Sequence, residues 1–218
     1  MGKIITQDEI MKLLDNLYTQ VKNGIPAVSK PVEQMVKEYI VKYPDPKIAS
    51  QKFINNQIKK CTTSGFLTGL GGFIALPVAI PANVGSTLYV QMRMIAGVAL
   101  MAGNDLNDDE VQTFVYVCLA GISVDQILKK AGIQVGERVA NNLIKKIPGE
   151  VLVKINQKIG MRFITKFGEK GVINMGKMVP LVGGILGGGF DFVETKAIAS
   201  RARKLFIEQD FSVLSDSK

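Results

Sequence analysis

The sequence predicts an all-α protein, a helical bundle with two glycine- and proline-rich apolar helical hairpins as its core. Apolar residues recur at helical spacing through most of the 218 residues, and no segment shows the alternation typical of a strand. Two apolar stretches, residues 65–105 and 178–189, are rich in glycine and proline. We expect one compact domain. Its predicted parts are amphipathic N-terminal helices in residues 1–60, a helical core in 61–210 and a disordered tail in 211–218.

Three amphipathic helices are predicted before the first apolar stretch. Thr6 and Glu9 form a capping-box pattern ahead of a helix that ends at Gly24. Pro31 opens the second helix, and Pro46, after the break "YPDP", opens the third. Each has an apolar stripe and a polar outer face, as in a soluble bundle.

The apolar stretch from Gly65 to Asp105 has the length of a membrane span. The 32 residues between Lys60 and Arg93 are uncharged, and a span needs about 20. Pro77 and Pro81 divide this run into short pieces, however, and a charge such as Arg93 within a span costs about 2.5 to 3.5 kcal/mol. We therefore interpret the stretch as a core hairpin, with a re-entrant membrane hairpin as the alternative.

A buried Arg93 needs a polar partner. Asp125 and Asp191 are candidates because both stand in apolar surroundings. The predicted buried polar cluster comprises Asn83, Gln91, Arg93, Asp125 and Asp191. The same region contains a weak internal sequence repeat, called the sequence echo below. Asn83, Thr87 and Arg93 have the same spacing as Asp191, Thr195 and Arg201.

The acidic segment "NDLNDDEVQTF" predicts the N-terminus of a helix, because carboxylates suit the positive end of the helix dipole. This explanation is simpler than a metal site built from the same acids. We expect the helix to bend near Gly121 and to continue to "KKAG". Further helices are predicted over residues 135–147, 150–167 and 190–209.

Composition excludes several classes of chemistry. The chain has no histidine, so it contains no Ser-His-Asp triad, Cys-His dyad or histidine-liganded zinc. The two cysteines, Cys61 and Cys118, lie in apolar helical contexts and are expected to be reduced core thiols. Ser64 and Ser123 lack a motif that would mark them as nucleophiles. We expect neither a metal nor a cofactor.

The positive charge is concentrated in the second half of the chain. Net charge is +8, and residues 129–204 carry fifteen Lys or Arg against five Asp or Glu. Within this region a cation recurs at every fourth position: Lys154, Lys158, Arg162, Lys166 and Lys170. An apolar stripe runs beside it: Leu152, Ile155, Ile159, Phe163 and Phe167. Adjacent cationic and apolar stripes are typical of a helix on an anionic membrane surface, where Phe and Ile insert. The alternative is the solvated face of a core-packed helix.

Nucleic acid is not an expected partner. Stacking aromatics do not interleave the basic residues, and zinc, helix-turn-helix and RNP signatures are missing. The run "GGILGGGFD" has no GK[ST] and no preceding strand, so it does not predict a phosphate loop. Anionic lipid, or a membrane protein, is the partner that the charge pattern favours.

The central and C-terminal segments resemble the EcsC family of bacterial proteins, over roughly Cys61 to Phe206. The residues that carry the likeness are Pro81, Asn83, Gln91, Arg93, Met94, Ile95, Ala99, Gly103 and Asp105, then Pro180, Gly183, Gly187, Asp191 and Ala199. Asn83 stands where relatives often have aspartate, so a carboxylate role is not carried over. The resemblance implies a setting beside an ABC exporter linked to secretion. It implies no established activity, and the lack of histidine excludes a histidine-dependent hydrolase.

Together these observations predict a non-catalytic protein on the cytoplasmic face of the membrane, held by anionic lipid and auxiliary to an exporter. A cytoplasmic location is expected because the first residues lack the apolar core of a secretory signal. Two alternatives stay open. One is a histidine-independent enzyme or binder of a small, lipid-like molecule, with a polar site between the hairpins. The other is a protein whose hairpins insert into the bilayer. Oligomeric state is not predicted.

Overall fold

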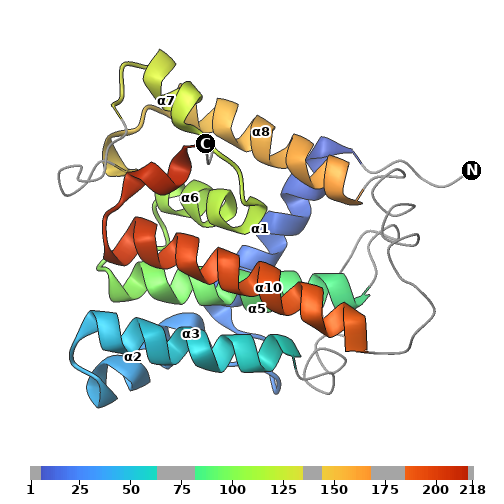
Figure 1. The fold of residues 1–218 in the computed structure, drawn as a ribbon, viewed down its shortest axis with the longest axis vertical. Helices are drawn as coiled ribbons and strands as arrows, with labels where there is room; N and C mark the ends of the chain where they lie inside the picture. Colours follow the sequence, from blue (N-terminus) through green and yellow to red (C-terminus); the bar gives the residue numbers. More distant parts are fainter. Residues whose placement is uncertain (1–5, 63–81, 135–143, 168–184, 216–218) are drawn as a thin grey trace, which may run out of the picture.

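The protein is an all-α helical bundle, which confirms the predicted fold class (Figure 1). The computed structural model describes residues 6–62, 82–134, 144–167 and 185–215, and the statements below concern these residues. None of them forms a strand, and a single isolated bridge joins Ile25 to Ser29.

The N-terminal part folds into three helices: α1 (Gln7–Asn23), α2 (Val32–Lys42) and α3 (Pro46–Thr62). The capping box is confirmed, since Glu9 N donates to Thr6 Oγ1 at 3.2 Å and Thr6 N donates to Glu9 Oε2 at 3.0 Å. Pro46 is the first residue of α3, where its missing N–H costs no intrahelical bond. Both α1 and α2 bury one apolar face and leave the other to solvent, as amphipathic helices do.

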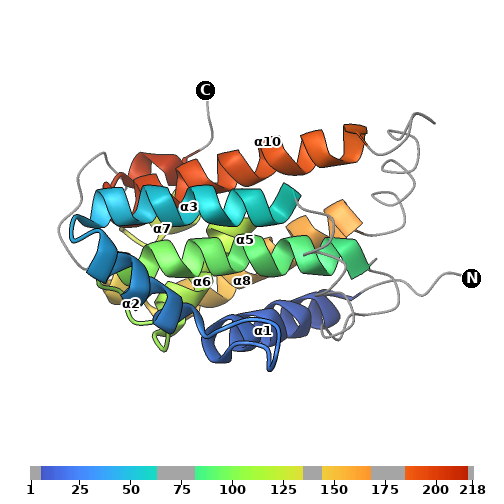
Figure 2. The ribbon, with the colours of Figure 1, turned by 90° about the horizontal axis from the view of Figure 1, so that it is seen from below.

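The central helix is α5 (Ala82–Met101), the second arm of the predicted first hairpin. It packs against α1, α2, α3, α6 and α10, and Figure 2 shows it between α3 and α10 on one side and α1 on the other. Among the described residues one segment, Val84–Met101, is long and apolar enough to cross a membrane, and 89% of it is buried inside the fold. In this structure it is a core helix, apolar on every side because neighbours cover every side.

The middle of the chain contributes these elements: α6 (Asp109–Ala120), α7 (Asp125–Lys130), a 3-10 turn (Ile144–Lys146) and α8 (Gly149–Phe167). The expected bend at Gly121 is corrected. The helix ends there, because Gly121 adopts a left-handed conformation with φ of 63°. A separate short helix, α7, then follows. The N–H of Val124, in the connection, donates to the carbonyl of Leu214 at 2.8 Å.

The C-terminal part consists of α10 (Ile185–Ala202), a π-helical turn (Arg203–Ile207) and a 3-10 turn (Phe211–Leu214). The expectation of a disordered tail from residue 211 is wrong for the first part of that tail. Phe211 and Leu214 are 5% and 0% exposed, so they anchor the chain end in the core. Asp210 begins the 3-10 turn by accepting from Ser212 N at 3.0 Å.

Parts of both predicted hairpins lie outside the described residues. These include the hinge at Pro77 and Pro81 and most of the run over residues 178–189. The helix ends that border the glycine-rich segments are described. The C-terminal ends of α3 and α8 and the N-terminal ends of α5 and α10 all lie at one end of the bundle (Figure 1).

Candidate functional site

A buried arginine organises the polar interior. Arg93 of α5 is 1% exposed, and its Nε donates to Gln57 Oε1 of α3 at 2.9 Å. Its Nη1 donates to Ser29 Oγ at 3.2 Å, just before α2. The guanidinium carbon lies 5.2 Å from the centre of the Tyr89 ring, and the Tyr89 hydroxyl is 2.6 Å from Ser29 Oγ. The arginine therefore ties together three segments that are far apart in sequence.

The electrostatics of this network follow from burial. Desolvation lowers the pKa of Arg93, and Tyr89 opposes that shift. The pKa of neighbouring Lys60 is also lowered, first by its own burial and then by the charge of Arg93. Arginine remains protonated in proteins, so the network holds a permanent cation whose N–H groups can only donate. Such a group fixes the orientation of every amide that it touches.

The structure places the predicted cluster residues in different environments. Gln91 is 2% exposed and its Nε2 donates to Thr195 Oγ1 at 2.9 Å, which joins α5 to α10. Asp125 is not beside Arg93. Its carboxylate accepts from Ser123 Oγ at 2.8 Å and from Lys129 Nζ at 3.1 Å.

The bonds from Ser123 and then Lys129 hold the pKa of Asp125 below its usual value. Asn83 and Asp191 belong to α5 and α10, and their side chains lie outside the described residues. The two helices that carry the sequence echo pack against each other.

Sequence reasoning missed the partners of Arg93. Gln57, Ser29 and Tyr89 are separated from it by 36, 64 and 4 positions, and only the last lies on the same helix. One signal was present for Gln57. It stands one turn after Phe53 and one turn before Cys61, as the one amide on a buried face of α3 that is otherwise apolar except for Ser50. A lone amide on a buried face needs a polar partner, and a buried charge is the strongest one available.

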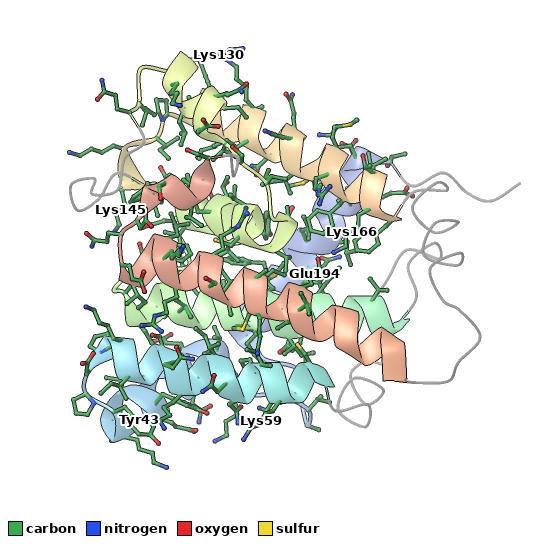
Figure 3. The ribbon with its side chains drawn as sticks, in the orientation of Figure 1. Tyr43, Lys59, Lys130, Lys145, Lys166 and Glu194 are labelled. Atoms are coloured by element: carbon green, nitrogen blue, oxygen red, sulfur yellow. The ribbon has the colours of Figure 1, made fainter. Side chains whose placement is uncertain are left out.

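The cations at every fourth position of α8, called the cation ladder below, differ in their contacts. Lys158 Nζ donates to the carbonyl of Ser123 at 2.7 Å, and Lys166 forms an ion pair with Glu194 of α10, which Figure 3 shows between the two helices. These two cations tie α8 to its neighbours. Lys154 and Arg162 are exposed, and so is Lys158 apart from the ammonium group that reaches Ser123. Lys170 lies outside the described residues.

The apolar stripe of α8 belongs to the core, so the expectation that it inserts into lipid is corrected. Its members are all buried: Leu152, Ile155, Ile159, Phe163 and Phe167. This face packs on α1 and α6. The apolar side chains that α8 does expose are Val153, at 56%, and Met161, at 55%. Each directly precedes an exposed cation, Lys154 and Arg162.

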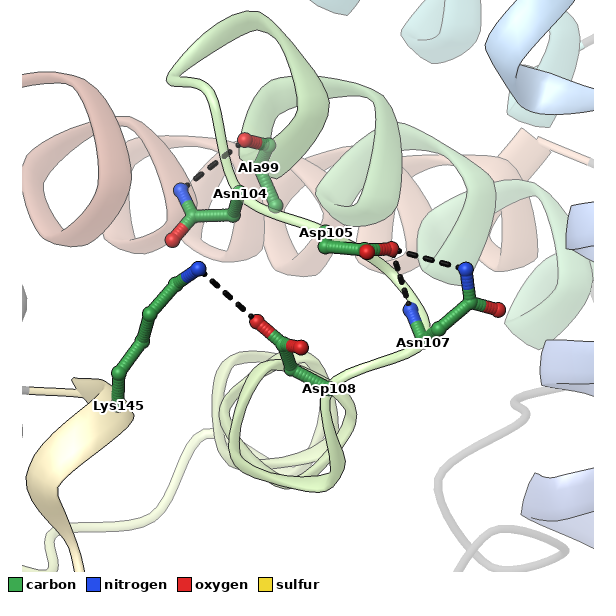
Figure 4. A network of polar contacts seen from close by, with 6 residues as sticks. All are labelled: Ala99, Asn104, Asp105, Asn107, Asp108 and Lys145. Atoms are coloured by element: carbon green, nitrogen blue, oxygen red, sulfur yellow. Dashed lines mark hydrogen bonds and ion pairs between the residues drawn. The ribbon is translucent and has the colours of Figure 1, made fainter.

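The acidic segment before α6 is a structural loop (Figure 4). Asp105 Oδ1 accepts from both the backbone N and the Nδ2 of Asn107 at 2.9 Å, and Asp108 pairs with Lys145 at 3.2 Å. Asn104 Nδ2 donates to the carbonyl of Ala99 at 3.1 Å, which closes the end of α5. The described residues contain no group of three or more acids, cysteines or histidines placed to hold a metal ion.

Neither Cys118 nor Ser123 is arranged as an activated nucleophile. Burial raises the pKa of the Cys118 thiol to about 12, and an inert thiol is the result. Ser123 donates a hydrogen bond to Asp125. The lowered pKa of Asp125 makes this carboxylate a weak general base for removing the Ser123 proton. Both cysteines are buried thiols, as predicted.

Comparison with known proteins gives one match. A model of the EcsC protein family matches residues 6–207, and the chain therefore belongs to that family. The match includes the N-terminal helices as well as the segments that carry the resemblance in sequence. No curated protein and no solved structure matches the chain significantly.

Proposed function

We propose that this EcsC family member binds peripherally to an anionic membrane surface through the outward face of α8. It would act on the cytoplasmic side, without catalysis, in support of a membrane partner such as an ABC exporter. The family membership carries no activity of its own, so the proposal depends on the surface of this chain.

The observation that carries the proposal is the pairing of exposed cations with exposed apolar side chains on α8. Val153 with Lys154, and Met161 with Arg162, form two such pairs about 12 Å apart along the helix. The acid nearest to them on α8, Glu150, stands at the start of the helix. A surface of this kind lets Lys and Arg stems reach phosphate groups while small apolar groups enter the headgroup layer.

The expected affinity is modest and depends on salt. Each Lys or Arg near an anionic leaflet contributes about 1 kcal/mol, and Lys154 and Arg162 together give about 2 kcal/mol. Because the core face of α8 is already buried in the bundle, binding needs no unfolding and adds only shallow insertion. Screening weakens the attraction, since the Debye length falls from about 10 Å at 0.1 M salt to about 3 Å at 1 M.

Vesicle flotation tests the proposal. Wild-type protein should float with phosphatidylglycerol vesicles at low salt, and much less with neutral phosphatidylcholine vesicles or at 1 M salt. The double variant Lys154→Gln/Arg162→Gln should lose about thirtyfold in vesicle affinity, the equivalent of two surface cations. The matched control Lys37→Gln/Lys47→Gln removes two exposed cations from the α2–α3 side and should bind as wild type. Equal flotation of the α8 variant and the control contradicts the proposal.

A polar small-molecule site between the hairpins gains no support from the described residues. Gln91 and Arg93, the predicted centre of such a site, are both buried and hydrogen-bonded to side chains of the fold. Their geometry is that of a core network which fixes helix positions.

A further inference from the structure

A groove of about 460 Å³ lies between α2 and α3, at the edge of the molecule opposite α8 (Figure 1). Its volume is within the usual range for small-ligand sites, about 300 to 1,000 Å³. Figure 3 labels Tyr43 and Lys59 on this edge. The lining residues are Glu38, Tyr39, Lys42, Tyr43, Lys52, Asn55, Asn56 and Lys59. They come from successive turns of the two helices and from Tyr43, which directly follows α2, so one face of each helix forms a wall.

The buried arginine determines what Asn56 offers to this groove. Arg93 Nε donates to Gln57 Oε1 at 2.9 Å, so the other end of the Gln57 amide must be its NH2 group. That Nε2 donates to Asn56 Oδ1 at 3.3 Å. The oxygen of Asn56 is thereby occupied, and the part of Asn56 left for a ligand is its NH2 donor.

These bonds form a relay from an arginine through a glutamine to an asparagine. A second relay of this kind determines which group Asn55 offers to a ligand. Arg203 Nη1 donates to Gln51 Oε1, and Gln51 Nε2 donates to Asn55 Oδ1 at 3.0 Å. The guanidinium has no acceptor, so this chain too can run in one direction only. Within the described residues the NH2 groups of Asn55 and Asn56 donate no hydrogen bond. Two arginine–glutamine–asparagine relays therefore present two neighbouring donors on the same wall.

Most of the charged residues of the groove also favour a hydrogen-bond acceptor. Three of them are lysines, Lys42, Lys52 and Lys59, and one is an acid. That acid, Glu38, already pairs with Lys30 at 2.7 Å. The aromatic wall is fixed, because the Tyr39 ring packs edge-on against buried Phe53 at 5.2 Å. The groove thus combines ammonium groups, oriented amide donors and two tyrosines.

We infer that this groove binds the phosphate group of a phosphate ester. A phosphate offers several acceptor oxygens and more than one negative charge, which matches several ammonium groups and two adjacent NH2 donors. The organic part of the ester lies against Tyr39 and Tyr43. The phosphate has two sources, a free phosphate ester or a lipid headgroup. The inference does not rest on the proposed role of α8, because none of the groove residues belongs to that helix.

NMR of the full-length ¹⁵N-labelled chain gives a direct test. Titration with sn-glycerol 3-phosphate should shift the side-chain NH2 signals of Asn55 and Asn56 saturably, and sodium chloride at equal ionic strength should not. Asn56→Asp replaces the donor by a carboxylate but can still accept from Gln57, so the relay is kept. This variant and Lys52→Gln should each weaken binding at least about tenfold. Lys47→Gln is the matched control and should bind as wild type.

The inference is overturned if chloride produces the same shifts, or if Asn56→Asp and Lys52→Gln bind as tightly as the control. Circular dichroism and the thermal midpoint of each variant establish that it is folded. Flotation of the same variants with phosphatidylglycerol vesicles then separates the two sources. Loss of flotation in Asn56→Asp identifies a lipid headgroup, and unchanged flotation with weaker glycerol phosphate binding identifies a free ester. If Lys154→Gln/Arg162→Gln floats normally, the proposed membrane contact of α8 is contradicted. The proposal that the groove binds phosphate is not affected by that result.

Discussion

Helices α5 and α8 both place cations within apolar sequence, and the structure uses these cations in opposite ways. Arg93, the one charged residue of α5, is 1% exposed and bonded to α3 and to the segment before α2. On α8, Lys154 and Arg162 are exposed. The difference comes from the number of neighbours. Five helices cover α5, whereas α8 is covered on its inner side by α1, α6 and α7.

This comparison separates the cations that build the fold from those that are available to a partner. A buried cation is costly unless every neighbour accommodates it, so its partners are fixed by folding. An exposed cation contributes little to stability, so it is available for a contact outside the fold. The proposed membrane contact uses only the second kind. Substitutions that distinguish the two helices test whether this division is correct.

The largest difference is expected from the same glycine substitution in each helix. In Gly97→Ala of α5, the new Cβ would lie 2.3 Å from the ring of Phe53, which is 0% exposed and has no room to move. Overpacking of this kind costs about 3 kcal/mol, or roughly 6 to 12 °C in the thermal midpoint. In Gly160→Ala of α8, the Cβ lies 2.5 Å from Cγ of Gln7, a half-buried side chain that can turn away if its bond to the carbonyl of Gln157 breaks. The better helix propensity of alanine, about 1 kcal/mol, offsets part of that cost, so the loss should be smaller than in Gly97→Ala.

Thermal unfolding followed by circular dichroism measures both variants. Truncating the obstructing ring, as Phe53→Leu in the Gly97→Ala background, should recover part of the lost stability. If Gly160→Ala destabilises the protein as much as Gly97→Ala, then α8 is packed as tightly as α5 and the comparison fails.

The features that sequence predicted well depend on neighbours in the chain. The capping box of Thr6 and Glu9 involves residues three positions apart, and helical periodicity is also local. The partner of Arg93 could not be predicted in this way, because Gln57 is 36 positions away and its approach depends on how α3 packs. Gly121 shows a second limit. A glycine within a helical pattern permits either a bend or a left-handed end, and the fold selects the end.

The ladder on α8 shows the same limit on the candidate site. A four-residue spacing places Lys154, Lys158, Arg162 and Lys166 along one side of the helix, as predicted. Which of them face a neighbour depends on the position of Ser123 and Glu194, which come from other parts of the chain. Local periodicity thus identified the helix and its charge, and tertiary packing decided which cations bond to a neighbouring element.

The next largest effect is expected where the buried cation loses an acceptor. Gln57→Leu keeps a side chain of similar size but removes the oxygen that accepts from Arg93 Nε. Losing a hydrogen bond to a buried charge costs about 2 kcal/mol, and we expect the midpoint of urea unfolding to fall accordingly. Gln57→Glu is the control. It keeps an acceptor and adds a negative charge beside the guanidinium, so it should lose less stability. A Gln57→Leu protein as stable as wild type would show that this network does not constrain the core.

The smallest effect is expected on the outer face of α8. The double variant Lys154→Gln/Arg162→Gln removes two cations from exposed positions, and surface charges contribute about 0 to 1 kcal/mol even when paired. The core stripe beneath them is untouched, so urea unfolding should match wild type within about 0.5 kcal/mol. Stability near wild type, together with weaker vesicle binding, is the combination that only a functional surface gives. A loss of stability as large as that of Gln57→Leu would instead mean that these two cations, like Arg93, belong to the fold.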